Sequence, residues 1–139
     1  MLLQIRSITT AQEIEDFLHN DTEIEPPWDI KDMEKACVRV HEAIAQEELI
    51  CVYGDYDADG VTSTALLYSY LEAVGAHVMY YIPSREAEGY GMNNAAVDTL
   101  HQKGVKLIVT VDNGIAAINE IRYAKSLGID TVVTDHHMP

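Results

Sequence analysis

The chain has 139 residues, 47% of them hydrophobic, which suffices for one domain with a hydrophobic core and excludes a disordered polypeptide. Lysine and arginine number 9 and aspartate and glutamate 23, so the formal net charge is −14. Such an acidic balance argues against a broad basic face that would hold nucleic acid by itself. The two cysteines, Cys37 and Cys51, form no CxxC pair, so we expect neither a zinc site nor a disulfide framework.

The first 28 residues predict a short lead-in with one helix over residues 10–20. Thr10 is a suitable N-cap, and Glu13 occupies the capping-box position three residues later. We expect no signal peptide, because charged residues such as Arg6 and Glu13 interrupt any apolar start. The apolar runs are of strand length, short of the roughly 20 residues of a membrane helix. These features predict a cytoplasmic protein without a membrane segment.

From Asp29 onward the chain alternates between helices and short apolar strands. Helices are expected at 29–48, 61–74, 94–103 and 115–127, and strands at 49–53, 77–82, 106–111 and 130–134. Within the helix at 61–74, the residues expected to face inward are Leu66, Leu67, Tyr70, Leu71 and Val74. The β-α-β-α-β-α-β order predicts an α/β fold with a doubly wound, mostly parallel sheet.

Acidic loops follow three of the four predicted strands. They are Gly54–Gly60 with three aspartates, Asp112-Asn113-Gly114, and Asp135-His136-His137. Because ligands of open parallel sheets bind beyond the carboxyl ends of the strands, we expect the side chains of these loops to meet at one edge. Carboxylates at such close range repel one another unless a cation lies between them. A pair of divalent metal ions is the simplest such cation, and it is typical of phosphoester chemistry.

Each loop alone also has a simpler interpretation. The spacing Asp55-x-Asp57-x-Asp59 occurs in EF-hands, but the twelfth position is Leu66 instead of glutamate, and a strand precedes the loop. The Asp57-x-Asp59 spacing also occurs in aspartyl-phosphate phosphatases, although their nucleophile lies directly at the strand end. Asp-Asn-Gly is a common turn, and two adjacent histidines normally point in different directions. The shared placement of the three loops favours the metal interpretation.

Together the three loops resemble motifs I, II and III of the DHH phosphoesterase superfamily, in Gly54–Val61, Val111–Ile115 and Thr134–His137. Two further stretches, Trp28–Ala36 and Ile82–Asn93, are similar to the RecJ family of bacterial exonucleases. The resemblance covers roughly residues 25 to 139, and we expect residues 1–28 to form a helical lead-in. It further implies that residues 29–139 are the N-terminal part of a DHH phosphoesterase domain, incomplete at its C-terminus.

The resemblance implies hydrolysis of phosphodiester bonds with Mn²⁺ or Mg²⁺, two ions being expected. The activity would be that of a 5′→3′ exonuclease that releases 5′-mononucleotides from single-stranded DNA in repair and recombination. Single-strand-binding protein and a helicase are implied partners. One alternative is a DHH phosphoesterase acting on short oligonucleotides, cyclic dinucleotides or pyrophosphate. Another is a non-catalytic DHH scaffold, although such proteins usually lose motif aspartates that are present here.

The family's site residues can be placed on matching positions of this chain. The implied metal ligands are Asp55, Asp57, Asp59, Asp112 and His136, with Asp112 bridging the two ions. Asp135 would orient His136, and His137 would contact a phosphate, so the implied catalytic set is Asp57, Asp59, Asp112, His136 and His137. The implied substrate contacts are Arg85, Tyr90, Asn93 and His137.

Three departures from the family pattern set further expectations. Tyr53 stands where many DHH enzymes have a histidine, so that ligand is missing here or Asp55 replaces it. The fourth motif and the additional C-terminal and oligonucleotide-binding domains of RecJ proteins have no counterpart in the 139 residues. We therefore expect this chain alone to bind Mn²⁺ weakly and to show little nuclease activity.

Overall fold

The structure, a computed structural model, describes residues 5–19, 26–84 and 91–138. The chain divides into two compact units, Met1–Met33 and Glu34–Pro139, which are described separately. Within the described ranges, no helix combines the length and the apolar character that crossing a bilayer requires. The proposed domain boundary after residue 28 stays a prediction.

The first unit contains helix α2, Ala11–His19, which begins with the predicted capping box. The backbone N–H of Thr10 donates to Glu13 Oε2 at 2.8 Å, and the N–H of Glu13 donates to Thr10 Oγ1 at 3.2 Å. Hydrogen bonds from the backbone of Thr10 and Thr9 lower the pKa of Glu13 to about 2. A 3₁₀ turn over Pro27–Asp29 follows.

The next helix is shorter than predicted. Helix α3 spans Met33–Ala45, whereas the apolar spacing predicted a helix over 29–48. At its start, Pro27–Asp29 forms a 3₁₀ turn and Asp32 has a left-handed φ of 58°, which is incompatible with an α-helix. At its end, Glu47 has a φ of 52°, so the chain turns there into the first strand.

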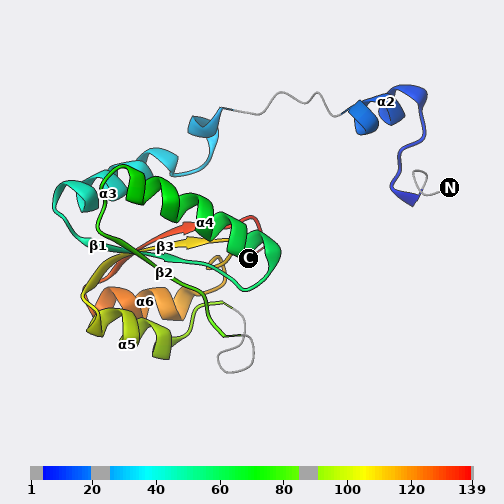
Figure 1. Ribbon diagram of the computed structural model, residues 1–139. Coiled ribbons are helices and arrows are strands. Elements are labelled where there is room, and N and C mark those ends of the chain that lie inside the picture. The colour runs from blue at the N-terminus through cyan, green and yellow to red at the C-terminus, as the bar shows by residue number, and fades with distance from the viewer. Residues whose placement is uncertain (1–4, 20–25, 85–90, 139) are drawn as a thin grey trace. The chain divides into compact units, whose positions relative to one another are not determined.

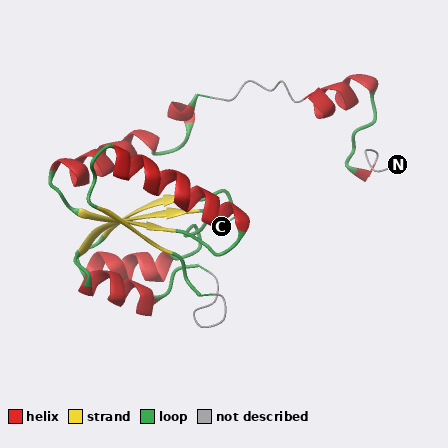
Figure 2. Ribbon diagram, viewed as in Figure 1, coloured by secondary structure: helices red, strands yellow, loops and turns green. Residues whose placement is uncertain are grey.

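Four parallel strands form the sheet of the second unit, in the spatial order β2-β1-β3-β4. They are β1 Leu49–Tyr53, β2 Val78–Tyr81, β3 Val105–Val111 and β4 Asp130–Thr134. The connecting helices are α4 Ala58–Ala73, α5 Asn94–Gln102 and α6 Ile118–Ser126. Helices α3 and α4 cover one face of the sheet, and α5 and α6 cover the other (Figures 1 and 2). The prediction of a doubly wound α/β fold is confirmed.

The core consists of one apolar cluster on each face of the sheet. Because alternate strand residues point to opposite faces, Cys51 and Tyr53 of β1 pack on the α5–α6 side. Ile50 and Val52 of the same strand pack against Leu71 of α4 on the other side. The strands are therefore almost continuously apolar, as expected for a parallel sheet that is buried on both faces.

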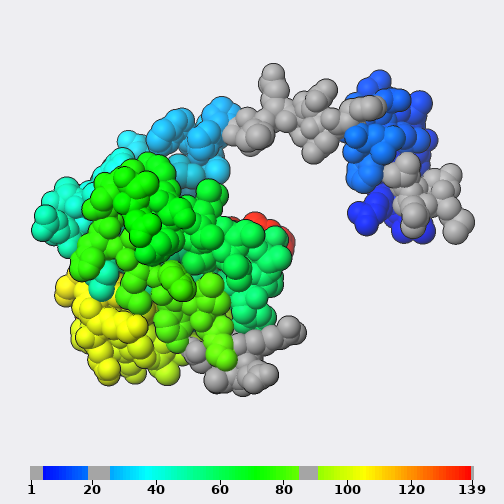
Figure 3. Space-filling view, viewed as in Figure 1, coloured from blue at the N-terminus to red at the C-terminus, as the bar shows by residue number. Residues whose placement is uncertain are grey.

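The predicted inward face of α4 is only partly correct. Leu71 is buried and Leu67 packs against the core, but Leu66, Tyr70 and Val74 are 75%, 61% and 47% exposed. Helix α4 forms part of the outer surface of this unit (Figure 3). Apolar residues lie on several sides of this helix, so spacing alone does not select the buried side. The buried side instead includes Thr64.

The sheet topology creates a crevice at one edge. Strand β1 pairs with β2 on one side and with β3 on the other. The connection through α4 therefore lies on one face, and the connection through α5 lies on the opposite face. At such a switch point the loops that leave the two neighbouring strands diverge, and ligands of doubly wound folds bind between them. The loops with the motif aspartates follow β1 and β3.

Candidate metal centre

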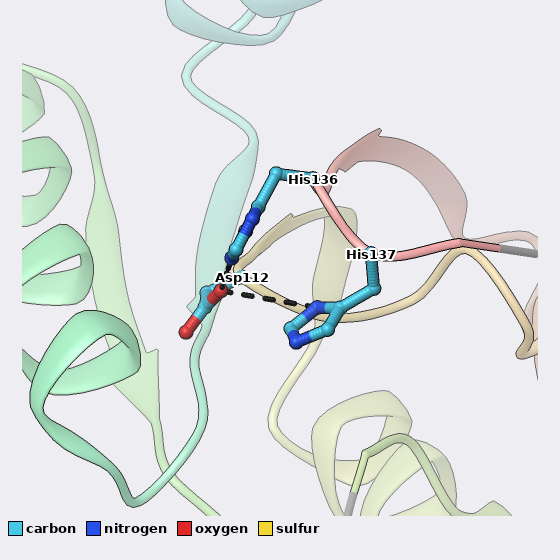
Figure 4. Close-up of side chains that lie close together, drawn as sticks. All are labelled: Asp112, His136 and His137. Atoms are coloured by element: carbon cyan, nitrogen blue, oxygen red, sulfur yellow. Dashed lines mark hydrogen bonds and ion pairs between the residues drawn. The ribbon is translucent and has the colours of Figure 1, made fainter. Parts of the chain in front are cut away.

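One carboxylate and two imidazoles gather beyond the carboxyl ends of β3 and β4 (Figure 4). Asp112 Oδ1 lies 2.9 Å from His136 Nε2 and 3.9 Å from His137 Nδ1. The ligand atoms of the three residues all lie within 4.8 Å of one another. Contrary to the expectation that adjacent histidines point apart, the loop after β4 directs both rings toward the same carboxylate.

The backbone around Asp112 is constrained. Asp112 has a left-handed φ of 61°, which aspartate tolerates better than most residues, and its N–H donates to Thr134 O at 3.0 Å. Gly114 has a φ of 107°, and a Cβ at this position would lie 2.7 Å from Thr110 Oγ1. The chain therefore bends at Asp112, and the Asp112 side chain points toward the histidines. Such strained conformations cluster at functional sites.

Asp55 provides a buried carboxylate on the β1 side of the crevice. The residue is 1% exposed, and its Oδ1 accepts the N–H of Tyr56 at 2.7 Å. Burial raises the pKa of Asp55, and the charges of Asp57 and Asp112 raise it further, against the opposing effects of Tyr56 N–H and His137. Asp55 thus lies in the same electrostatic field as the motif II and motif III residues.

Asp57 and Asp59 belong to the start of α4, which begins at Ala58 instead of the predicted Val61. Asp57 is the N-cap, since its Oδ1 accepts the N–H of Gly60 at 2.9 Å. Asp59 lies in the first turn and, with Ser63, Asp112 and His136, lines a cleft of about 360 Å³. Among the described residues, neither aspartate belongs to the compact group of Asp112 and the two histidines.

The absence of a side chain at Gly60 allows the motif I loop to pack closely against the start of α4. A Cβ at Gly60 would lie 2.6–2.8 Å from the backbone N, C and O atoms of Asp55. Backbone atoms at that distance cannot give way as a flexible side chain does. The close approach of Gly60 therefore sets the position of Asp55 relative to the start of α4.

Asp135 acts on His137. Its side chain is 2% exposed; Oδ2 accepts the N–H of Ile115 at 2.9 Å, and Oδ1 lies 2.8 Å from His137 Nδ1. Burial alone would raise the pKa of Asp135, but the N–H groups of His137 and Ile115 and the imidazole together lower it. The Asp135 hydrogen bond raises the pKa of His137. Asp135 was expected to orient His136, whereas its imidazole partner in the structure is His137.

Tyr53, at the position where many DHH enzymes have a histidine, is a core residue. It is fully buried, its ring stacks on Tyr81 with centroids 5.2 Å apart, and its hydroxyl donates to Gly91 O at 3.2 Å. The side chain therefore anchors the segment that precedes α5 and does not face the Asp112 cluster. Asp55, the residue expected to replace that histidine, is close enough to Asp112 and His137 for their charges to shift its pKa, and its ligand role stays a prediction.

Of the predicted substrate contacts, Arg85 and Tyr90 lie outside the described residues. Asn93 is the N-cap of α5, and its Oδ1 accepts the N–H of Ala96 at 2.8 Å. Its role as a substrate contact stays a prediction.

Two side chains that sequence reasoning missed connect the strand ends. Asn113 Nδ2 donates to Tyr53 O at 3.1 Å and to Val111 O at 2.9 Å. Thr134 Oγ1 donates to Thr110 O at 2.6 Å. The partners of Asn113 and Thr134 lie up to 60 residues away in the chain, so no local pattern indicates these contacts.

The donor set fits a divalent transition metal. Carboxylate oxygens and imidazole nitrogens are suitable ligands for such ions, and the two kinds of donor meet here. Among the described residues, no lysine or arginine pairs with the four motif aspartates, Asp55, Asp57, Asp59 and Asp112, and the carboxylate of Asp112 forms ion pairs only with histidines. A metal ion would place positive charge near Asp55, whose pKa is raised by burial and by the neighbouring carboxylates of Asp57 and Asp112.

Residues 49–139 match the family described as "DHH family, N-terminal domain", and this stretch contains all four strands and the Asp112 cluster. The chain therefore belongs to the DHH family.

Within that family the chain is similar to RecJ exonucleases. It is 47% identical over 139 residues to the single-stranded-DNA-specific exonuclease RecJ of Bacillus subtilis, covering 99% of this chain and 18% of that protein. It is 40% identical over 136 residues to the RecJ of Escherichia coli, covering 96% of this chain and 23% of that protein. The chain thus spans about a fifth of the length of these curated relatives.

Two solved structures support the same relationship. A crystal structure of exonuclease RecJ bound to manganese superposes with a TM-score of 0.73 at 43% identity, covering 78% of this chain and 28% of that one. The structure of RecJ from Thermus thermophilus in complex with Mn²⁺ gives a TM-score of 0.69 at 37% identity, covering 82% of this chain and 16% of that one.

Proposed function

We propose that this chain supplies motifs I to III of a RecJ-type exonuclease that hydrolyses single-stranded DNA in the 5′→3′ direction and releases 5′-mononucleotides. The observation that carries the proposal is the cluster of Asp112, His136 and His137 beyond the carboxyl ends of β3 and β4, together with the buried Asp55 after β1. The relatives named above are single-strand-specific exonucleases, and two of the similar structures contain manganese.

The site would hold two Mn²⁺ or Mg²⁺ ions. Bound there, the ions would supply an activated water and neutralise the charge of the phosphate during in-line displacement. The residues that would hold them are Asp55, Asp57, Asp59, Asp112 and His136. Asp112 comes from the β3 end and is bracketed by both histidines, which suits the bridging position. Asp59 approaches the same cleft from α4.

The remaining residues would position the substrate. Asp135 holds the ring of His137 through Nδ1, so this imidazole keeps one orientation at the edge of the cluster. His137 would then donate a hydrogen bond to a phosphate oxygen. Arg85, Tyr90 and Asn93 are the proposed contacts to the DNA strand. The net charge of −14 indicates that other parts of a RecJ-type protein would provide most of the basic surface for DNA.

The cellular context follows from the same similarity. A RecJ-type exonuclease would act in the cytoplasm, in DNA repair and recombination. Single-strand-binding protein and a helicase would supply its single-stranded substrate.

A graft tests the proposal. This chain would replace the corresponding residues of the Bacillus subtilis RecJ, to which it is 47% identical over 139 residues. With Mn²⁺, the graft should release a 5′ label from single-stranded DNA at once as mononucleotide, retain a 3′ label until late, and leave duplex DNA intact. The chain alone should show little activity.

Two outcomes would contradict the assignment. A folded graft that binds Mn²⁺ but digests no DNA would overturn the nuclease function. Hydrolysis of di- to pentanucleotides without attack on long strands would move the chain to the branch of the superfamily that acts on small substrates.

A further inference from the structure

We propose that Asn113 is a positioning residue of this centre, whose buried side-chain amide sets the separation between the loops that carry Asp55 and Asp112. The inference rests on the proposed metal-binding function. Asn113 is 1% exposed, and its Nδ2 donates to Tyr53 O at 3.1 Å and to Val111 O at 2.9 Å. Tyr53 ends β1 two residues before Asp55, and Val111 ends β3 directly before Asp112.

The backbone at these strand ends explains why such a connection is needed. The paired register of β1 and β3 ends at Tyr53 and Thr110. The next backbone N–H groups pair with the outer neighbours of β1 and β3: Gly54 donates to Tyr81 O of β2 at 2.9 Å, and Asp112 donates to Thr134 O of β4 at 3.0 Å. The paired register of β1 and β3 therefore ends before Asp55 and Asp112. The Asn113 amide adds a hydrogen-bonded connection between the two strands at this point.

The second hydrogen bond acts on Asp112 itself. Because Nδ2 of Asn113 returns to the carbonyl of Val111, the side chain closes a small loop with Asp112 inside it. Asp112 has a left-handed φ of 61°, a conformation that persists only when the surroundings impose it. The amide of Asn113 and the bond from Asp112 N–H to Thr134 O together impose it.

Stability alone does not account for an asparagine here. Its Oδ1 is buried and has no hydrogen-bond partner among the described residues, which costs free energy in the folded state. A leucine of similar size would avoid that cost but would lose both donor bonds. The asparagine therefore lowers the stability of the folded state but fixes the geometry of the two aspartate-bearing loops.

The test compares two buried substitutions in this chain, Asn113→Leu and Ile129→Val. Ile129 is 1% exposed and directly precedes β4, at the end of the sheet opposite the acidic loops, so its change lowers stability without touching the centre. Mn²⁺ binding would be measured from the electron paramagnetic resonance signal of free Mn²⁺, and stability by urea unfolding in EDTA. Asn113→Leu should weaken Mn²⁺ binding by about 10-fold or more, as the loss of residues that orient ligands does, and Ile129→Val should leave it unchanged.

The outcomes separate this inference from the proposed function. Mn²⁺ affinity that is equal in the unsubstituted chain and in Asn113→Leu would overturn the positioning role alone. Where the unsubstituted chain binds no Mn²⁺, the same variants are compared in the graft, and absence of Mn²⁺ binding there would overturn the proposed function and this inference with it. If Asn113→Leu does not fold, Asn113→Ser, which keeps one hydrogen-bond donor, is measured instead. An Mn²⁺ affinity equal to that of the unsubstituted chain would overturn the positioning role. Weaker Mn²⁺ binding, at a stability no lower than that of Ile129→Val, would support it.

Discussion

Asp130 at the amino end of the parallel sheet and Asp55 at its carboxyl end have opposite electrostatic surroundings. At the amino end, Asp130 begins β4 and pairs with Lys125 Nζ at 2.5 Å and with Arg39 Nε at 2.8 Å. Arg39 also pairs with Glu48 at 2.6 Å. At the carboxyl end, Asp55 is buried beside other carboxylates, and Asp112 has only histidines as partners among the described residues.

The pKa shifts express the same contrast. Lys125 and Arg39 lower the pKa of Asp130, so the folded protein favours the charged form of that residue. Burial and the charges of Asp57 and Asp112 raise the pKa of Asp55, so the folded protein without metal disfavours its charged form. Asp130 is paired within the fold, whereas Asp55, under the proposed function, would meet a cation that the protein itself does not supply.

The largest expected effect comes from Asp112→Asn. Asparagine tolerates the φ of 61° but removes the charge that both histidines face. Mn²⁺ binding by this chain, and exonuclease turnover by the graft, should each fall by at least about 100-fold. Metal-free stability in urea should not fall, because repulsion with Asp55 is relieved.

The matched control is Asp130→Asn at the amino end. It should lower stability and leave Mn²⁺ affinity unchanged. If Asp130→Asn weakened Mn²⁺ binding as strongly as Asp112→Asn, the contrast between the two ends would be wrong.

Gly60→Ala should be the next largest effect. Its Cβ would meet the Asp55 backbone at 2.6–2.8 Å, so the motif I loop must move. Overpacking of this kind costs about 1–3 kcal/mol, and the displaced Asp55 should also weaken Mn²⁺ binding. Urea unfolding and Mn²⁺ titration measure the two effects.

Gly75→Ala serves as the control for this substitution. Gly75 has a φ of 80°, and a methyl group added there would have no atom within 4 Å, so alanine strains only the backbone. It should cost about 1 kcal/mol and leave Mn²⁺ binding unchanged. Equal Mn²⁺ affinity in the Gly60 and Gly75 variants would show that Gly60 does not position Asp55.

The strands and the edge at which the acids gather could be predicted from sequence. Residues 49–53 and 130–134 are short β-branched runs, and β1 and β4 match them at both ends. The parallel order then places the three acidic loops at one edge, because every parallel strand ends there. Local composition and topology suffice for this level of prediction.

The parts that could not be predicted depend on contacts between distant residues or on side chains with two roles. Asp57 was assigned as a metal ligand and catalytic residue, yet its bond to Gly60 N–H also starts α4 at Ala58. The hydroxyl of Tyr53 bonds to Gly91, 38 residues away, and its carbonyl accepts from Asn113, 60 residues away. Neither contact leaves a periodic signal in the sequence.

Arg39→Met should have a smaller effect, confined to the amino end. The guanidinium joins Glu48 and Asp130 and is 21% exposed, so its loss leaves two carboxylates without that partner. We expect a loss of about 1–3 kcal/mol in urea unfolding at neutral pH. Lys125→Met, at a side chain that is 73% exposed, should cost less than about 1 kcal/mol. A change of Mn²⁺ affinity in either variant would contradict the separation of the two ends.

The smallest expected effect is on the pH dependence of stability. It should have opposite signs in Asp130→Asn and Asp55→Asn, both measured by urea unfolding in EDTA. The pKa of Asp130 is lowered on folding, so its contribution to stability is present above the unfolded pKa of about 4 and is lost as the pH falls through the folded value. The deficit of Asp130→Asn relative to the unsubstituted chain should therefore shrink as the pH is lowered from 7 toward 3.

The contribution of Asp55 to stability depends on pH in the opposite direction. Its pKa is raised on folding, so its contribution is fully present below the unfolded pKa of about 4 and is lost as the pH rises through the folded value. Metal-free Asp55→Asn should therefore gain stability relative to the unsubstituted chain as the pH rises from 4 to 7. Saturating Mn²⁺ should reverse that gain, because the metal stabilises only the folded protein with its ligands intact. If the stability differences of Asp130→Asn and Asp55→Asn changed with pH in the same direction, the protein alone would stabilise the charged carboxylates of both residues, and the contrast would be wrong.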